Sequence, residues 1–153
     1  MTVFIGDFDV KLDAKGRFLF PSSLISQLGE NSNCTFVIKK DIYEKCLNIY
    51  TSEQWQLRVE TLRKSLNPFN RQHNIFLREF FKDTAECSLD SSNRILIPKR
   101  LVQSVELKSE IYVVGVDTKI EIWSKEEYDK TRPTAEEYAN IAGNILGNIE
   151  LPF

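Results

Sequence analysis

The sequence contains nearly the same ten residues twice, once in each half of the chain. Residues 12–21 read LDAKGRFLFP, and residues 89–98 read LDSSNRILIP. Both copies consist of Leu-Asp, two variable residues, a turn-forming residue, Arg, three apolar residues and Pro. A repeat of this kind indicates one structural unit built twice, and this constrains the fold more than any single motif does.

The similarity between the two halves continues beyond these ten residues. Each copy is followed by a short run of helical character, a β-rich run, and a second β-rich run that leads into an acidic helix start. The three runs are residues 22–29, 34–40 and 46–55 in the first half and residues 100–107, 110–117 and 119–128 in the second. Ser52 and Ser124 are the expected N-caps of the following helices, because a serine hydroxyl accepts a hydrogen bond from a free first-turn amide.

The residues between the halves and after the second half are predicted to be helical. Apolar residues recur at helical spacing up to a break at Asn67-Pro68, then in a second helix, and then in an amphipathic tail. They are Trp55, Val59, Leu62 and Leu66, then Ile75, Phe76, Phe80 and Phe81, and then Tyr138, Ile141, Ala142 and Ile145. No long linker separates the halves, so we expect one compact pseudo-symmetric domain. The apolar tail is expected either to dock on this domain or to cap a neighbouring copy.

Each ten-residue copy has the composition of a tight turn that presents an arginine. Gly16 and Asn93 stand directly before the arginine, and these two residue types adopt positive φ most readily. An aspartate four residues before the arginine can accept hydrogen bonds from the turn amides. The arginine, Arg17 or Arg94, is therefore expected at the tip, at the start of the outgoing strand.

Two interpretations of this Asp–Arg pair remain open from the sequence. In the first, an ion pair between Asp13 and Arg17, or between Asp90 and Arg94, only staples the turn. In the second, the aspartate orients the arginine for contact with a phosphate or a guanine, both of which suit the planar fork of a guanidinium. The spacing of the residues is compatible with both.

The pairing of these two motifs resembles the MraZ family, bacterial regulators of the division and cell-wall gene cluster. The resemblance spans essentially the whole chain, including the helical insert and the tryptophan of IEIWSKEEY at residues 120–128. It implies an α+β fold of two pseudo-symmetric AbrB-like swapped-hairpin repeats that form one compact β-rich domain with flanking helices. The corresponding division is residues 1–84 for the first repeat with its insert, 85–132 for the second repeat, and 133–153 for a helical tail.

The resemblance also implies a function and a set of site residues. Members form ring-like homo-oligomers that bind direct repeats in a promoter, usually that of their own operon. By position, the DNA-binding residues are Asp13 with Arg17 and Asp90 with Arg94, and Lys15 adds a charge at the first tip. Many members have Gly where this chain has Asn93, which still suits the turn. We expect Arg17 to matter more than Arg94, because the second tip has more bulk and no added lysine.

The charge of the chain does not by itself indicate a nucleic-acid binder. The formal net charge is −2, but it is unevenly distributed. Residues 58–82 carry six basic and two acidic side chains, a net charge of +4, and residues 126–153 carry six acidic and two basic, a net charge of −4. A weakly basic face repeated around a ring binds through multivalency. The basic helical segment is either a solvated helix face or a contributor to DNA binding.

Several other classes of protein are disfavoured by the sequence. The start of the chain has Asp7, Asp9 and Lys11 where a signal peptide needs an apolar core, and no run is apolar enough for a membrane span. We therefore expect a cytoplasmic, nucleoid-associated protein. The single His73 and three cysteines at 34, 46 and 87 show no catalytic or metal-ligand spacing. We predict no enzyme activity, no metal, no cofactor and no small-molecule substrate.

An alternative function is an AbrB-like protein–protein module, either an antitoxin or a ring scaffold whose hairpins serve assembly only. A gel-shift assay with the upstream region of the protein's own operon separates this class from a DNA-binding regulator. A neighbouring gene that encodes a toxin would favour the alternative.

Overall fold

The two halves of the chain fold into the same succession of elements. The structure, a computed structural model, describes residues 2–29 and 34–150. Residues 1 and 30–33 of the expected first repeat and residues 151–153 of the expected tail therefore lie outside it. The first half comprises β1 (Phe4–Lys11), β2 (Arg17–Leu19), α1 (Ser22–Leu28), β3 (Thr35–Lys40), β4 (Leu47–Thr51), α2 (Ser52–Ser65) and α3 (Arg71–Phe81). The second comprises β5 (Thr84–Ser88), β6 (Arg94–Leu96), α4 (Lys99–Ser104), β7 (Glu110–Asp117), β8 (Lys119–Ser124), α5 (Lys125–Thr131) and α6 (Ala135–Leu146).

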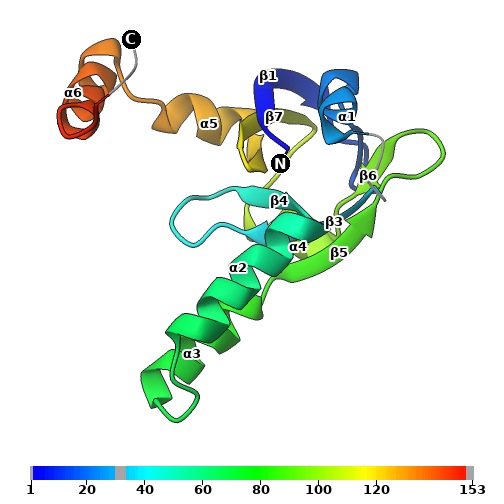
Figure 1. Ribbon diagram of the computed structural model, residues 1–153. Helices are drawn as coiled ribbons and strands as arrows, with labels where there is room; N and C mark the ends of the chain where they lie inside the picture. Colours follow the sequence, from blue (N-terminus) through cyan, green and yellow to red (C-terminus); the bar gives the residue numbers. More distant parts are fainter. Residues whose placement is uncertain (1, 30–33, 151–153) are drawn as a thin grey trace.

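The strands form a six-stranded antiparallel sheet in the order β1-β7-β8-β4-β3-β5 (Figure 1). The first strand of each half pairs with the other half: β1 lies against β7, and β5 lies against β3. The two central strands, β8 and β4, are the last strands of the two repeats, so a pseudo-twofold axis passes between them. This exchange of strands confirms the expected α+β fold with two swapped repeats.

The apolar triplets of the repeated motif form a second, smaller sheet, in which β2 pairs antiparallel with β6. Side chains of a strand alternate between its faces. Phe18 and Ile95 therefore enter the core with exposed fractions of 1% and 0%, whereas Leu19 and Leu96 between the buried positions remain 58% and 53% exposed. Burial of each such side chain contributes about 1.5–3 kcal/mol to folding. The repeat thus supplies equivalent halves of one core.

Side-chain oxygens cap the starts of α2, α3, α5 and α6, with one correction to the sequence prediction. Ser124 accepts a hydrogen bond from the amide of Glu127 at 3.2 Å and caps α5 as predicted. At α2 the cap is Thr51, which accepts from the amide of Gln54, and the prediction of Ser52 is wrong by one residue. The reason is that Ser52 is already helical, and its hydroxyl donates to the Thr35 carbonyl at 3.2 Å.

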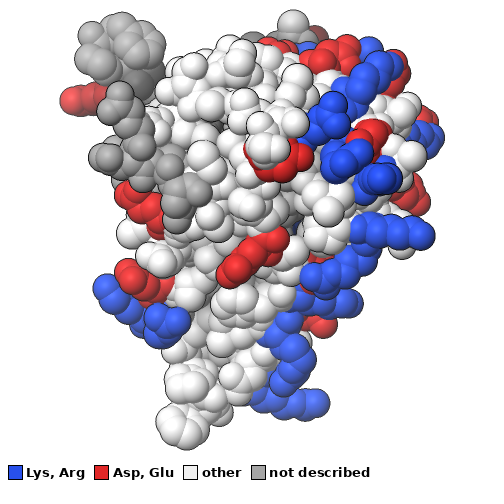
Figure 2. All heavy atoms as spheres, turned by 90° about the vertical axis from the view of Figure 1, so that its right-hand side faces the viewer, with Lys and Arg blue, Asp and Glu red and all other residues white. Residues whose placement is uncertain are grey.

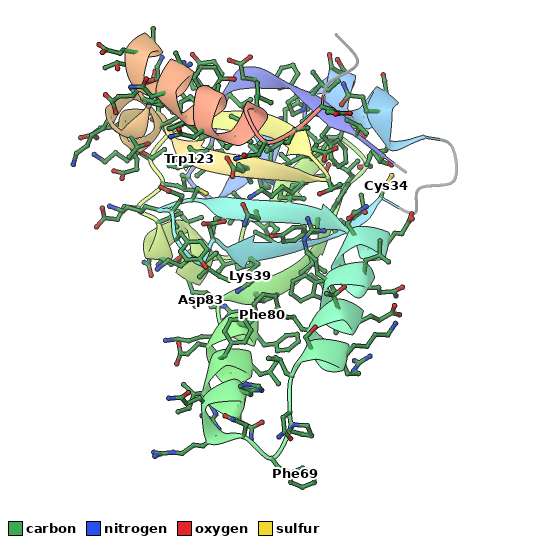
Figure 3. The ribbon with its side chains drawn as sticks, turned by 60° about the vertical axis from the view of Figure 1, so that its left-hand side comes forward. Cys34, Lys39, Phe69, Phe80, Asp83 and Trp123 are labelled. Atoms are coloured by element: carbon green, nitrogen blue, oxygen red, sulfur yellow. The ribbon has the colours of Figure 1, made fainter. Side chains whose placement is uncertain are left out.

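The α2–α3 hairpin projects from the sheet and is held at its base by aromatic packing (Figure 1, Figure 3). The rings of Trp55 and Phe80 stack with their centroids 5.7 Å apart. Lys39 is 5% exposed; its ammonium lies 4.4 Å from the centroid of Phe80 and donates a hydrogen bond to the Phe80 carbonyl near the end of α3. Phe69 at the tip of the hairpin is 96% exposed and points away from the domain (Figure 3).

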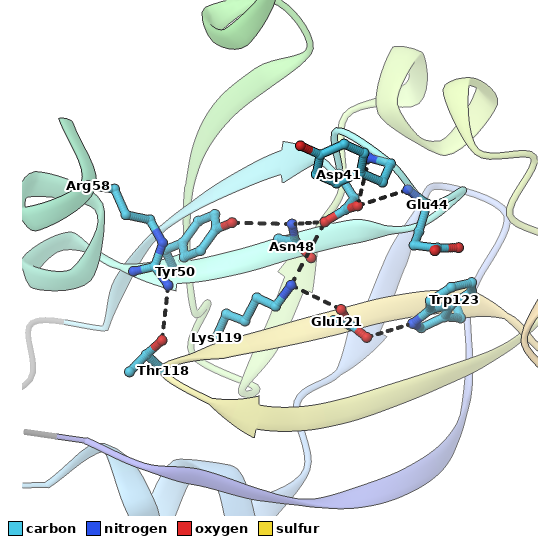
Figure 4. A network of polar contacts seen from close by, with 10 residues as sticks. Asp41, Glu44, Asn48, Tyr50, Arg58, Thr118, Lys119, Glu121 and Trp123 are labelled. Carbon is cyan, nitrogen blue, oxygen red and sulfur yellow. Dashed lines mark hydrogen bonds and ion pairs between the residues drawn. The ribbon is translucent and has the colours of Figure 1, made fainter. Parts of the chain in front are cut away.

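A partly buried polar network joins the two repeats where β4 meets β8 (Figure 4). The Lys119 ammonium lies 3.0 Å from a carboxylate oxygen of Glu121 and 3.8 Å from one of Asp41. The Asn48 amide donates to the same Asp41 oxygen at 2.7 Å. Arg58 on α2 reaches across to the Thr118 hydroxyl at 2.9 Å. The network therefore fixes the two repeats relative to each other.

Helix α6 extends away from the sheet at one end of the molecule (Figure 1). Its side chains include none that is buried. Docking on the chain's own domain, one of the two expectations for the tail, is therefore wrong within the described residues, and covering of a neighbouring copy remains a prediction. None of the helices in residues 2–29 and 34–150 is long and apolar enough to cross a membrane.

Candidate nucleic-acid interface

The β2–β6 pairing brings the tips of the two repeated motifs together. In the antiparallel register Arg17 lies opposite Leu96, and Leu19 lies opposite Arg94. Arg17 and Leu19 share one face of β2, and Arg94 and Leu96 share the same outer face of β6, since the core-facing residues alternate with them. The two arginines are therefore diagonal neighbours on the outer face of one short ribbon.

The two turns lock onto each other through equivalent backbone hydrogen bonds. The amide of Ile97 donates to the Gly16 carbonyl at 2.8 Å, and the amide of Phe20 donates to the Asn93 carbonyl at 2.9 Å. Gly16 has a φ of 88° and Asn93 a φ of 60°, which confirms the predicted left-handed turn positions. A Cβ atom at Gly16 would lie 2.8 Å from the Ile97 carbonyl oxygen, so this position also needs glycine for space.

Asp13 fixes both the first turn and the side chain of Arg17. One carboxylate oxygen accepts hydrogen bonds from the amides of Lys15 at 3.0 Å and Arg17 at 2.8 Å. The other oxygen accepts from Nε of Arg17 at 3.0 Å. The backbone hydrogen bond from Arg17 is the main cause that lowers the pKa of Asp13, so the carboxylate is ionised at neutral pH.

The second turn has the same backbone but a different arrangement of side chains. Asp90 accepts from the amides of Ser92 and Arg94, both at 2.8 Å. Within the described residues no hydrogen bond or ion pair joins its carboxylate to the Arg94 guanidinium, in contrast to the first turn. The backbone hydrogen bond from Arg94 lowers the pKa of Asp90, and the nearby charges of Arg94 and Arg17 contribute to the same shift. Arg17 is therefore oriented by its aspartate, whereas Arg94 has no such side-chain contact among the described residues.

The five residues predicted for the site do not all line one surface. Asp13, Arg17 and Arg94 line one surface depression of about 620 Å³, which the start of α1 also borders through Ser22 and Ser23. Lys15 borders a different depression, beside α4, and Asp90 lines neither of them. The two serines were not predicted from the sequence. Their position next to the proline that ends the motif is a signal that would have found them.

Several other cations of the chain have partners of their own. Lys11 forms an ion pair with Glu110 at 3.0 Å, and Arg100 donates to the Thr84 carbonyl at 2.9 Å. Arg58, the first cation of the basic helical segment, bonds Thr118 and stacks on the ring of Tyr50. On the face drawn in Figure 2, Lys and Arg side chains gather along one margin, and Asp and Glu side chains are fewer there. The positive charge is thus concentrated on part of the surface.

His73 contributes to a turn, Cys46 is buried in the core, and Cys87 packs against the core. Nδ1 of His73 accepts a hydrogen bond from the amide of Asn67 at 2.9 Å and closes the turn between α2 and α3. Burial raises the pKa of the Cys87 thiol to about 12, and burial also raises that of Cys46. The sulfur of Cys46 and carboxylate oxygens of Asp41 and Glu121 lie within 4.8 Å of one another. The ammonium of Lys119 already pairs with both carboxylates there.

Comparisons with known proteins identify similar chains over nearly the whole length. The model of the family described as "MraZ protein, putative antitoxin-like" matches residues 3–79 and 80–143. A protein of Bacteroides fragilis is 38% identical over 130 residues, which cover 85% of this chain and 82% of the relative. A protein of Bacteroides thetaiotaomicron is 34% identical over 97% of this chain and 95% of the relative. A protein of Pediococcus pentosaceus is 37% identical over 94% of this chain and 97% of the relative. Each of the three is named "Transcriptional regulator MraZ".

Proposed function

Because the chain belongs to the MraZ family, we propose that it regulates transcription by sequence-specific binding to DNA. The family is one of transcriptional regulators and not of enzymes. The proposed target is a set of direct repeats in the promoter of the protein's own operon, within the division and cell-wall gene cluster. The proposed active form is a ring-like homo-oligomer in the cytoplasm, associated with the nucleoid.

The observation that carries this proposal is the diagonal placement of Arg17 and Arg94 on one exposed ribbon. A ribbon of two strands fits the major groove of B-DNA, which is about 12 Å wide, and a guanidinium there can bond both acceptors of a guanine. The same guanidinium can also form two parallel hydrogen bonds with one phosphate. A purely structural staple does not require two arginines on the same outer face.

We assign different roles to the predicted site residues. Arg17 is the main contact to DNA, and Asp13 positions it through the 3.0 Å ion pair. Lys15, exposed on the first turn, contributes a phosphate contact. Arg94 is a second, less constrained contact, and Asp90 holds the turn that presents it.

The net charge of −2 is compatible with this proposal if the protein acts as an oligomer. Each copy presents one ribbon, and neighbouring copies present equivalent ribbons to successive repeats. Once one ribbon is bound, the effective concentration of the next one is high, so modest single-site affinities combine into strong promoter binding. Five of the six acidic residues of segment 126–153 lie in other elements of the fold, α5 and α6: Glu126, Glu127, Asp129, Glu136 and Glu137.

The decisive experiment compares DNA affinity and thermal stability on the same preparations of Arg17→Ala. We expect promoter binding to be lost while the melting temperature and the oligomer mass are retained. The matched control is Lys130→Ala, which removes one exposed positive charge from α5. Normal DNA binding by a destabilised Arg17→Ala variant would show that the motif is a structural staple. A protein–protein module that binds no promoter DNA at all would give flat titrations with the wild-type chain.

A further inference from the structure

The ribbon of β2 and β6 carries the same residue types on the outer face of both strands. These are Arg17 and Leu19 on β2 and Arg94 and Leu96 on β6, in antiparallel pairing. A ribbon in the major groove is flanked by the two phosphate backbones of the duplex, so side chains beside the ribbon lie next to phosphates. The ribbon itself offers equivalent surfaces to the two backbones. A difference between its two sides therefore comes from the residues around the tips.

The residues around the two tips differ in charge at equivalent positions of the repeat. Lys15 in the first turn corresponds to Ser92 in the second turn. After the proline that ends each motif, Lys99 at the start of α4 corresponds to Ser22 at the start of α1. All four side chains are exposed. Two exposed cations thus have neutral, equally exposed counterparts.

The exchange between the repeats brings Lys15 and Lys99 to the same side of the ribbon, although they belong to different repeats. The first turn lies against the second repeat, because the carbonyl of Gly16 accepts a hydrogen bond from the amide of Ile97. A Cβ atom added at Gly16 would also lie 3.7 Å from a methyl carbon of Val102 in α4. The two lysines accordingly line one depression of about 690 Å³ between this turn and α4.

The second turn has no equivalent pair of cations among the described residues. It lies near the start of α1, because the carbonyl of Asn93 accepts a hydrogen bond from the amide of Phe20. Ser22 in α1 lines the depression of about 620 Å³ that also holds the two arginines. The lysine that lines this depression, Lys11, already pairs with Glu110 at 3.0 Å.

The ammonium groups of Lys15 and Lys99 form no ion pair within the described part of the chain. The third lysine of their depression, Lys108, pairs with Glu126 at 2.9 Å. Asp13, which lines this depression and that of the two arginines, is already bonded within its own turn. The two depressions therefore meet at Asp13, and two unpaired cations stand next to the arginine ribbon. An ammonium of this kind binds a phosphate as a point charge.

We propose that Lys15 and Lys99 form a phosphate clamp, which holds the DNA backbone on the α4 side of the ribbon only. Phosphate contacts position a protein on the duplex and carry no sequence information themselves. The clamp therefore fixes where the ribbon lies in the groove, while the arginines contact the bases. This inference rests on the proposed function, because it concerns the same ribbon. It adds Lys99 as a DNA-binding residue and makes the backbone contacts of each copy one-sided.

The repeat itself supplies the variants for a test. Lys15→Ser and Lys99→Ser give each position the residue of its counterpart, and the structure shows that serine fits both. The amide of Ser92 donates to its turn aspartate as that of Lys15 does. Helix α1 begins with Ser22 after a proline, as α4 begins with Lys99. Because both lysines are exposed, the melting temperature of the double variant should equal that of the wild type.

The loss of binding should depend on salt and not on DNA sequence. On a duplex that carries one promoter repeat, each replacement should reduce the salt slope by about 0.9. The wild type should then lose about twelvefold more affinity than the double variant as the salt concentration rises from about 50 to 200 mM. Lys130→Ser in α5 is the matched control for Lys99→Ser, since it also removes one exposed helical lysine, and it should leave the slope unchanged.

Hydroxyl-radical footprinting of each DNA strand tests whether the contact is one-sided. The wild type should protect the backbone more strongly at one flank of the repeat, and the double variant should lose this extra protection. Protection at the other flank should stay the same. A loss spread evenly over both flanks would contradict the clamp, and equal effects of Lys99→Ser and Lys130→Ser would assign the loss to overall charge and overturn it.

Arg17→Ala on the same duplex separates this inference from the proposed function. If the wild type binds the repeat through Arg17 while Lys99→Ser changes neither the salt slope nor the footprint, the clamp is refuted and the proposed function stands. If the wild type binds no promoter DNA, both are refuted.

Discussion

Arg17 and Arg94 occupy equivalent positions in the repeat, but only Arg17 is held by a side-chain contact with its own aspartate. A preoriented guanidinium loses less rotamer freedom on binding than a free one. Arg17→Ala should therefore weaken DNA binding more than Arg94→Ala does. We expect Arg17→Ala to cost about 1–3 kcal/mol of binding free energy for each copy whose arginine contacts a base. Its effect on unfolding should stay within about 0.5 kcal/mol, as for an ordinary surface site. Fluorescence anisotropy with promoter DNA, together with chemical denaturation, measures both quantities; equal losses of affinity would contradict the asymmetry.

Gly16 is required by both the backbone angle and the space of the first turn. A side chain there meets a φ of 88° and the Ile97 carbonyl oxygen at 2.8 Å. Gly16→Ala should lower the free energy of unfolding by about 1–3 kcal/mol, the usual cost of a residue in a disfavoured backbone region. Gly143→Ala is the matched control, since nothing lies within 4 Å of its added Cβ inside α6. Denaturant titration should show this control to be neutral or slightly stabilising, and a similar loss in both variants would argue against the close approach.

The ionised carboxylates of Asp13 and Asp90 predict how the tips respond to acid. Their pKa values are below the ordinary 3.8, because turn amides donate hydrogen bonds to the charged form. A lowered folded pKa means that the stabilisation is complete above the ordinary pKa and is lost as the pH falls through the folded value. The melting temperature of the wild type should therefore drop more steeply below pH 3.8 than that of Asp13→Asn. Parallel curves for the two proteins would show that Asp13 does not stabilise the turn through its charge.

At the level of elements, Lys119 neutralises Asp41 and Glu121 in the network that joins β4 to β8. Burial alone would lower the pKa of Lys119, but the hydrogen bond and charge of Glu121 raise it above its ordinary value. Lys119→Met should destabilise the fold by about 1–3 kcal/mol, because two partly buried carboxylates lose their cation. Lys125→Met removes a more exposed ion pair with Asp9 and should cost at most about 1 kcal/mol. Urea denaturation compares the two, and equal costs would mean that the network contributes no more than a surface pair.

Elements that depend on residue type and local spacing could be predicted from the sequence. The repeat, the positive φ of Gly16 and Asn93, and the helix with Phe76 and Phe80 follow from short-range patterns. The sequence alone could not decide whether Thr51 or its neighbour Ser52 is the N-cap of α2. The choice depends on the hydrogen bond from Ser52 to Thr35 in another strand. The polar network joins residues from distant parts of the chain, and no periodicity indicates it. The strand exchange was expected only through the family resemblance.

The candidate site shows the same division between local and tertiary information. The aspartate-to-amide bonds of both turns follow from the motif itself. The side-by-side position of the tips depends on the pairing of β2 with β6, and the sequence indicates this only through its pseudo-symmetry. The unequal orientation of Arg17 and Arg94 is a side-chain property that two nearly identical motifs do not distinguish.

At the level of the whole molecule, an acidic protein that binds DNA must rely on a local concentration of positive charge. Binding through phosphate contacts releases counterions, so the logarithm of affinity falls linearly with the logarithm of salt concentration, by about 0.9 for each phosphate neutralised. We expect a steep fall between about 50 and 200 mM salt for the assembled protein, because contacts from several copies add. A flat dependence for the wild type would argue against DNA as the partner.

The salt slope also distinguishes the two possible targets of Arg17. If its guanidinium contacts a phosphate, Arg17→Ala should reduce the salt slope by about 0.9 per bound copy. The variant should then bind all DNA sequences more weakly, and to the same extent. If it contacts a guanine, the slope should change little, and discrimination between the promoter repeat and a repeat with that base replaced should fall. Lys15→Ala serves as the phosphate-type reference at the same tip. Because Asp13 holds Arg17 in a fixed orientation, we expect the second result, and a uniform loss across DNA sequences would contradict it.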